Sequence, residues 1–102
     1  MNLVTVQSLL QGKFLRQYGQ HGPGDGQLDH PYGICADRYN HIIVSDTWNN
    51  RIQLLSEDGK FVNTLLNKEN GIEWPQAVAV DDQGHLIIVE QHGLVKIYQY
   101  MA

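Results

Sequence analysis

The sequence predicts an all-β fold built from repeated antiparallel sheets, and three observations predict it. The first is an internal repeat: residues 31–37 (PYGICAD) match residues 75–81 (PQAVAVD), and residues 41–46 (HIIVSD) match residues 85–90 (HLIIVE), both 44 residues apart. The second is that short segments rich in β-branched residues alternate with turn-forming Gly, Asn and Asp. The third is that helical periodicity is nowhere convincing.

Each repeat divides into short strands separated by turns. In the first strand the small residues Gly33 and Cys35 leave room for close neighbours, and the copy keeps small residues at Ala77 and Ala79. In the third strand Ile52 and Leu54 share one face, because strand side chains alternate. An Asp-Gly turn follows at residues 58–59. In the first repeat we therefore expect strands at residues 33–37, 41–46, 51–55 and 60–66.

Four sequential antiparallel strands in about 40–45 residues is the period of a β-propeller blade. We therefore expect blades that bury their faces against one another. The boundaries follow from the repeat: a lead-in with a candidate strand at 1–11, an outer strand of a preceding or closing blade at 12–19, a complete blade at 31–66, and a last blade lacking its outer strand at 75–100.

Composition narrows the function classes. A chain of 102 residues holds one small domain, which excludes a multi-domain enzyme. Seven Lys and Arg stand against 11 Asp and Glu, which argues against a dedicated basic patch for nucleic acid. Cys35 is the single cysteine, so neither an internal disulfide nor a zinc-binding thiolate cluster is expected. The apolar run 86–89 is too short for a membrane span. We expect a cytoplasmic protein without metal, cofactor or membrane contact.

The first unit resembles the NHL repeat at residues 31–37, 42–53 and 58–61, and the glycine-rich run 22–31 is similar to the loop that leads into an NHL blade. The second unit departs from the pattern, with Glu90, Gly93 and Leu94 where the first has Asp46, Asn50 and Arg51. The function of the Asp–Arg pair is therefore expected to be missing there. The resemblance implies a six-bladed propeller, as in the tripartite-motif (TRIM) proteins, whose NHL modules bind proteins or RNA.

About two blades cannot close a six-bladed ring. One hypothesis is that the chain is the carboxy-terminal part of a longer protein, in which the remaining blades complete the ring. The alternative is that three identical chains close one ring, each lending its first strand to a neighbour's last blade. Residues 94–100 are similar to the last strand of TRIM–NHL proteins, and the resemblance implies a final blade that borrows its outer strand from the start of the propeller, with residues 12–18 as such an outer strand.

The loops on one side of the predicted blades carry the candidate binding residues. Aromatic side chains with Arg or amides anchor either a protein partner or stacked RNA bases. The candidates are Tyr32, Trp48, Asn49, Asn50, Arg51, Trp74, Gln76 and His92. Acids outnumber bases in these loops, so a protein partner is preferred and RNA is the alternative.

No nucleophile–base or carboxylate pair stands at an interpretable spacing, so no catalytic residue is predicted. The function expected is a non-catalytic interaction module that binds substrates for a TRIM–NHL type ubiquitin-ligase protein, whose zinc-bound RING is absent from this chain. Post-transcriptional regulation through an RNA-binding surface is the first alternative. A piece of a propeller lyase or hydrolase is the second.

The remaining polar residues have structural explanations. Asp46 and Arg51 flank a turn and are expected to pair, with the carboxylate on turn amides and the guanidinium along the blade edge. His41 and His85 share one turn position in the two repeats, and Asp37 and Asp81 are expected to tie those turns. Histidines at 21, 30 and 92 lack the tight spacing of a metal site. Cys35 is expected to be a buried, inert thiol.

Overall fold

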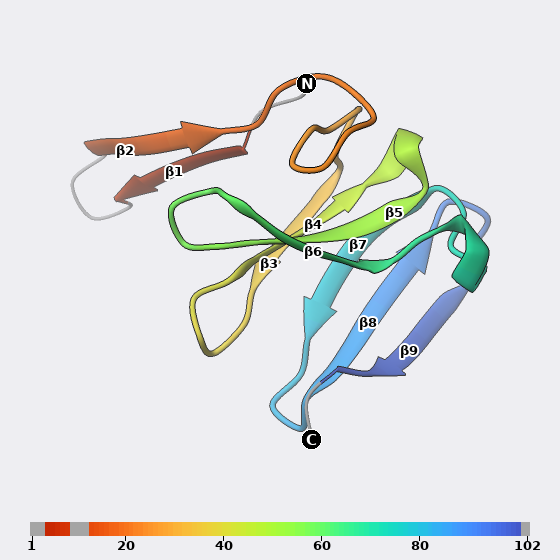
Figure 1. Ribbon diagram of the computed structural model, residues 1–102. Helices are drawn as coiled ribbons and strands as arrows, with labels where there is room; N and C mark the ends of the chain where they lie inside the picture. The colour runs from red at the N-terminus through yellow and green to blue at the C-terminus, as the bar shows by residue number, and fades with distance from the viewer. Residues whose placement is uncertain (1–3, 9–12, 101–102) are drawn as a thin grey trace.

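The computed structural model describes residues 4–8 and 13–100, and in these residues it contains strands, turns and two short 3-10 helices (Figure 1). The predicted all-β class is confirmed. The strands form three antiparallel sheets with neighbours in sequence order. They are β1 (Val4–Ser8) with β2 (Lys13–Tyr18); β3 (Gly33–Ala36), β4 (Ile42–Asp46), β5 (Arg51–Leu55) and β6 (Phe61–Leu66); and β7 (Pro75–Val80), β8 (His85–Glu90) and β9 (Val95–Gln99).

The first-repeat strands lie within one residue of the predicted bounds, and the two repeats pair in the same register. Cys35 lies opposite Ile43 in the first repeat. Ala79 lies opposite Ile87 in the second repeat, and each of these residues is 44 positions after its counterpart in the first. The helix η1 (Thr47–Asn49) joins β4 to β5, and η2 (Lys68–Asn70) follows β6. The two repeats are therefore structural copies as well as sequence copies.

The β3–β4 and β7–β8 turns are built alike. Asp37 Oδ1 accepts the backbone N–H groups of Tyr39 and His41, both at 2.9 Å, and its Oδ2 lies 2.8 Å from His41 Nδ1. Asp81 makes the same contacts with Gln83 and His85 in the second repeat. The expectation that these aspartates tie the turns is confirmed, and it accounts for both histidines.

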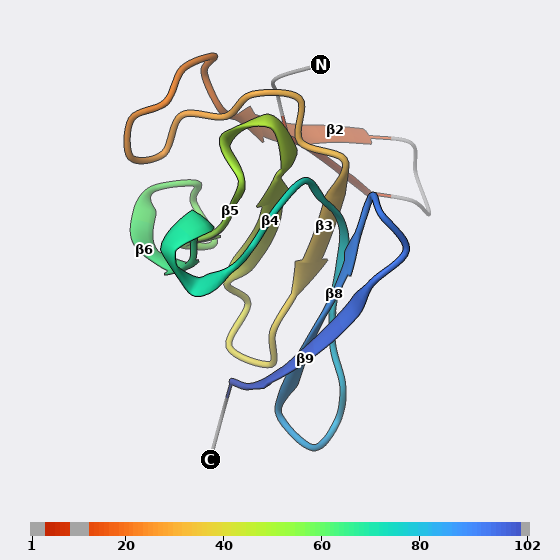
Figure 2. The same ribbon diagram turned by 90° about the vertical axis from the view of Figure 1, so that its right-hand side faces the viewer.

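The main apolar core lies between the four-stranded and the three-stranded sheet (Figure 2). Ile43, Ile52 and Leu54 of the first sheet pack with Leu86 and Ile88 of the second. Strands β3 and β7 lie closest together, which is why a glycine is required at position 33. A Cβ there would stand 2.8 Å from the Cα of Ala77. The two sheets therefore stack face to face, as successive blades of a partial propeller do.

A second, smaller cluster lies on the opposite face of the first sheet. Leu28, from the loop before β3, is fully buried against Val44 and Leu55. Ile72, which is 44 residues after Leu28, occupies the matching place between the two sheets. The loop that leads into each sheet thus inserts one apolar side chain behind it.

Strand β2 pairs with β1, from Val4 opposite Tyr18 to Ser8 opposite Lys13. The outer strand expected at 12–19 is therefore seen as one half of a hairpin. Its residue 12, like residues 1–3 and 9–11 of the lead-in, lies outside the described residues. Within the described chain β9 has β8 as its sheet neighbour and forms an edge.

Cys35 is half-buried, less than its expected full burial. Burial raises the pKa of its thiol to about 11, with a further contribution from the charge of Asp37. The thiol is thus protonated at neutral pH, as an inert cysteine requires. No helix in the described part of the chain is long and apolar enough to cross a membrane.

Candidate functional site

Three connections come together at one end of the stacked sheets: the loop 19–32, the η1 connection, and the loop 67–74 that leads into β7 (Figure 1). Hydrogen bonds join them in sequence. The N–H of Trp48 donates to the carbonyl of Asp29 at 3.1 Å, and the N–H of Trp74 donates to Asn50 Oδ1 at 2.9 Å. The N–H of Gln91, after β8, donates to the carbonyl of Trp74 at 3.0 Å. These bonds define one continuous loop surface.

The carboxylate of Asp46 is the centre of the first half of this surface. Its side chain is fully buried. One oxygen accepts the backbone N–H of Asp29 at 2.7 Å. The other accepts Arg51 Nε at 2.7 Å, Asn49 Nδ2 at 3.0 Å and Gln53 Nε2 at 3.1 Å. Four donors compensate a charge that burial would otherwise penalise.

Arg51 uses its remaining N–H groups on the loop 19–32. Its Nη1 donates to the carbonyl of Pro23 at 2.7 Å, and its Nη2 donates to those of Gly24 and Gln27 at 2.9 and 2.8 Å. The Asp46–Arg51 contact is present as expected, but the carboxylate receives the backbone N–H of Asp29 instead of turn amides. The pair therefore fixes the loop onto the sheet.

The second repeat keeps this arrangement with other residues. Glu90, at the position of Asp46, accepts the backbone N–H of Glu73 at 2.8 Å and Lys96 Nζ at 3.0 Å. Lys96 also donates to the carbonyl of Gly71 at 2.7 Å, as Gln53 donates to that of Gln27 at 2.6 Å in the first repeat. The expectation that the Asp–Arg function is missing from the second unit was wrong, because a Glu–Lys pair replaces it.

Gln53 and Lys96 were not singled out from the sequence. Gln53 is fully buried in β5, and its Oε1 also accepts the N–H of Gly26 at 3.0 Å. The sequence contains one feature that could have identified them. Both repeats have a long side chain with a terminal N–H group, Gln53 or Lys96, at the same strand position between two apolar residues.

Four aromatic rings form the outer part of the loop surface. The imidazole of His30 stacks on Trp48, with centroids 3.7 Å apart and planes at 14°. Trp74 meets the edge of Trp48 at 5.8 Å, and Tyr32 meets His30 at 6.5 Å. Trp48 is 46% exposed and Tyr32 is 56% exposed. The structure thus brings together three of the predicted aromatic residues and adds His30; we call these four rings the aromatic cluster.

The backbone at two of these residues is unusual. His30 and Trp74 have φ values of 50° and 48°, and each precedes a proline. Side-chain-bearing residues rarely adopt this left-handed region, and a neighbouring proline restricts them further. Such strain costs about 1–3 kcal/mol per residue and is concentrated at functional sites. The same backbone strain occurs at the equivalent position of both repeats, so it belongs to the loop conformation that the two repeats share.

The other predicted residues are less available to a partner. Asn49 donates to the carbonyl of Gly22 and to Asp46, Asn50 accepts from Trp74, and Arg51 is occupied by the loop carbonyls. Gln76 is half-buried in β7. His92 is exposed, with Nε2 3.8 Å from a carboxylate oxygen of Glu73. By repeat position His30 and Trp48 correspond to Trp74 and His92, so the two residue types exchange places.

Acidic side chains lie on the loops that carry the aromatic cluster. Asp29 Oδ1 contacts His30 Nδ1 at 2.7 Å and lies 3.7 Å from His21 Nδ1. Asp25, Glu69 and Glu73 are exposed on the same loops. Because the guanidinium of Arg51 is held by carbonyls and Asp46, it offers little positive charge to a ligand.

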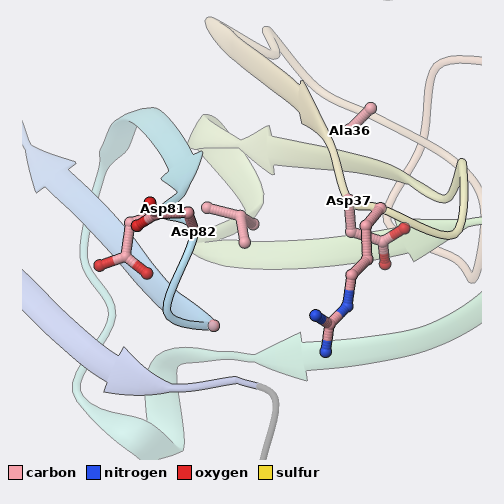
Figure 3. A pocket seen from close by; sticks show the side chains of 7 residues that line it. Ala36, Asp37, Asp81 and Asp82 are labelled. Atoms are coloured by element: carbon pink, nitrogen blue, oxygen red, sulfur yellow. The ribbon is translucent and has the colours of Figure 1, made fainter.

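A separate cleft of about 370 Å³ lies at the opposite end, between the β3–β4 and β7–β8 turns. Figure 3 shows Asp37 on one side of it and Asp81 and Asp82 on the other. Tyr100 donates its hydroxyl to Asp37 Oδ2 at 2.8 Å and its N–H to the carbonyl of Gly84 at 2.9 Å, so it joins the two turns. Among the described residues no group of three or more His, Cys, Asp or Glu is placed to hold a metal ion.

Comparison with known proteins identifies the repeat. Residues 28–53 match the family model described as NHL repeat. Protein brain tumor of Drosophila melanogaster is 31% identical over 88 residues, which are 82% of this chain and 8% of that protein. Protein lin-41 of Caenorhabditis elegans is 46% identical over 46 residues, 45% of this chain and 4% of that protein. E3 ubiquitin-protein ligase TRIM71 of Xenopus tropicalis is 46% identical over 44 residues, 43% of this chain and 5% of that protein.

The chain spans less than a tenth of the length of each of these relatives. The matched segment 28–53 holds the buried network of Asp46, Arg51 and Gln53 and the stacked rings of His30 and Trp48. The resemblance seen in the sequence is confirmed: the chain contains an NHL repeat and matches the NHL region of TRIM–NHL proteins.

Proposed function

We propose that the chain is a protein-binding module and that the aromatic cluster is its contact surface. The observation that carries this is the stack of His30 on the exposed ring of Trp48, continued by Trp74 and the exposed Tyr32, with a strained backbone at His30 and Trp74. Exposed aromatic side chains held rigidly are the usual anchors of protein interfaces, because they bury a large area and lose little conformational entropy on binding.

The acidic side chains on these loops indicate the chemistry of the partner. Asp25, Glu69 and Glu73 stand on the same loops as the rings, and of the basic side chains there Arg51 is already occupied. A segment of the partner that carries Lys or Arg beside an apolar residue fits this surface, since a cation can lie over the Trp48 ring while the carboxylates attract it. Phosphates would meet repulsion from the same carboxylates.

The wider role proposed follows the relatives. TRIM71 is named an E3 ubiquitin-protein ligase, and a binding module in such a protein would select the substrate. We propose that residues 31–66 form a complete blade, that residues 75–100 form a last blade without its outer strand, and that residues 12–19 supply an outer strand. The four-stranded and three-stranded sheets support the first two assignments.

The test uses a displayed library of random peptides selected on the 102-residue chain. We expect the selected peptides to be enriched in Lys and Arg and to bind at least 10-fold more weakly to Trp48→Ala. Val62→Ala is the matched control, because Val62 is also 46% exposed but lies on the outer strand β6, which does not contribute to the aromatic cluster. Equal binding by the two variants would overturn the assignment of the site.

RNA binding is distinguished in a parallel assay with single-stranded polyuridine. We expect weak binding with a shallow dependence on salt, because few basic groups are available to meet phosphates. The opposite result is tight polyuridine binding that weakens steeply between 50 and 200 mM salt and is lost in Trp48→Ala. It would show that the aromatic cluster binds RNA and not a protein.

A further inference from the structure

The cleft between the β3–β4 and β7–β8 turns is lined by side chains of opposite charge. Arg38 and Asp82 occupy the same position of their turns, 44 residues apart, and both line this cleft of about 370 Å³. Both residues are exposed, and among the described residues neither side chain forms a hydrogen bond or an ion pair. The two repeats thus place a cation and an anion around one cleft, and the two charges do not neutralise each other.

The carboxylates of the cleft differ in their capacity to accept a further donor. The side chain of Asp37 is fully buried, and its two oxygens already accept four contacts from its own turn and from Tyr100. The side chain of Asp81 is 33% exposed, and within the described chain its Oδ2 has one contact, with His85 Nδ1 at 2.9 Å. The acceptors open to a ligand are therefore Asp81 and Asp82, which lie on the same side of the cleft (Figure 3).

The cleft is formed before any ligand enters. Tyr100 bonds to Asp37 through its hydroxyl and to Gly84 through its N–H, so the two turns are held at a fixed separation. The apolar part of the lining comes from Ala36 and from Val80, which packs against the main core. A ligand that binds a rigid cleft loses less free energy to the ordering of the protein.

The β3–β4 turn adds a contact surface beside the cleft. The guanidinium of Arg38 lies 5.5 Å from the ring centre of Tyr39, and Tyr39 is 63% exposed. Tyr and Arg are enriched among the residues that dominate protein interfaces. A ligand that extends beyond the cleft can cover this ring, which favours a segment of a protein. The phosphates of a nucleic acid would meet repulsion from Asp81 and Asp82.

We propose that this cleft binds a segment of a partner protein that carries one basic and one acidic side chain. The basic group of the segment lies against the carboxylates of Asp81 and Asp82, and its acidic group lies against Arg38. This arrangement pairs each open charge of the cleft with its opposite. The cleft and the aromatic cluster lie at opposite ends of the sheets, so this second contact is independent of the proposed function.

The test measures the binding of short labelled peptides to the 102-residue chain by fluorescence anisotropy. One series carries a Lys and a Glu separated by a variable run of alanines, and a matched series carries two Lys; both ends are capped to remove their charges. We expect Arg38→Glu and Asp82→Lys each to weaken the Lys–Glu peptide by about 3–10-fold, because each replaces an attraction by a repulsion. Arg38→Glu should also bind the Lys–Lys peptide more tightly than the wild type does, a gain that a damaged fold would not produce.

Two controls separate the cleft from other surfaces. Lys60→Glu makes the same charge reversal on an exposed side chain outside the cleft, and Trp48→Ala removes a ring of the aromatic cluster; both should bind the Lys–Glu peptide like the wild type. The proposal is overturned if no Lys–Glu peptide binds, if the two cleft variants bind it unchanged, if Arg38→Glu gains nothing with the Lys–Lys peptide, or if Lys60→Glu weakens binding equally. Loss of binding in Trp48→Ala would place the peptide on the aromatic cluster, which overturns the cleft proposal and leaves the proposed function intact.

Discussion

Replacing Asp46 by Asn is the sharpest test of the buried network. The side chain is fully buried, and its carboxylate accepts four hydrogen bonds, from Asp29, Asn49, Arg51 and Gln53. Asparagine keeps the shape but removes the charge, and it replaces one acceptor oxygen by an NH2 group. At least one donor then faces another donor, and the Arg51 guanidinium loses its counter-charge.

Removing one partner of a buried ion pair costs about 3–5 kcal/mol, because the other is left uncompensated. A chain of 102 residues has a free energy of unfolding of about 5–15 kcal/mol, so Asp46→Asn should remove a large part of that stability. At about 4–8 °C per kcal/mol, the midpoint of thermal unfolding should fall by roughly 12–40 °C. Glu90→Gln should cost about half as much, because Glu90 has two donors and Lys96 reaches solvent.

Urea unfolding followed by tryptophan fluorescence at one protein concentration measures the loss of stability in Asp46→Asn and in Glu90→Gln. Tryptophan fluorescence is a suitable probe because Trp48 and Trp74 lie on the loops that the network holds. Asp82→Asn is the control: it makes the same substitution on an exposed side chain and should leave the midpoint unchanged. An Asp46→Asn variant within about 1 kcal/mol of the wild type would refute the argument that the carboxylate fixes the loop.

Three further results are expected at the other end of the sheets. Tyr100→Phe should lower the free energy of unfolding by about 1–2 kcal/mol in urea titrations at pH 7, because it removes the hydroxyl bond to the Asp37 carboxylate; an unchanged midpoint would contradict the bridging role. Burial raises the pKa of Asp37, but hydrogen bonds from Tyr100, His41 and Tyr39 outweigh it and hold the pKa below its ordinary value. Stability from this group is thus fully present above about pH 4 and is lost as the pH falls through the lower native pKa, so titrations from pH 7 to pH 2 should show a smaller acid loss in Asp37→Asn than in the wild type. Finally, with its pKa raised to about 11, the Cys35 thiol should react with a disulfide reagent at pH 8 roughly 100-fold more slowly in the native chain than in urea, and comparable rates would exclude a protected thiol.

The fold could be predicted because it depends on local patterns that recur. Alternating apolar residues, turn residues and a 44-residue repeat are enough to place the strands, and the Asp37 and Asp81 turns follow from a carboxylate four residues before a histidine. The turn contacts of Asp37 and Asp81 with the following residues need no knowledge of distant contacts, since those partners lie within four residues.

The buried network and the aromatic cluster could be predicted only in part, because their partners are far apart in sequence. Arg51 binds carbonyls up to 28 residues away, and His30 stacks on a ring 18 residues later. The Glu90–Lys96 pair was missed for a different reason. A pattern match scores residue identity, whereas the structure requires only an acceptor at the end of one strand and a long donor at a fixed place in the next.

Comparison of the two repeats distinguishes the residues that hold the loop on the sheet from the residues that the loop exposes to a partner. Both repeats fix the loop by the same two bonds, a carboxylate on a backbone N–H and a long donor on a carbonyl, although the residues differ. Both hold the residue before the proline in the same strained backbone, yet that residue is His30 in one repeat and Trp74 in the other. The hydrogen bonds and backbone conformation that hold the loop, which we call the frame, are the same in both repeats, whereas the aromatic ring differs. Each repeat can therefore contribute a different contact to one surface. Substitutions of the rings should therefore alter which partner binds, whereas substitutions of the frame should alter whether the surface exists.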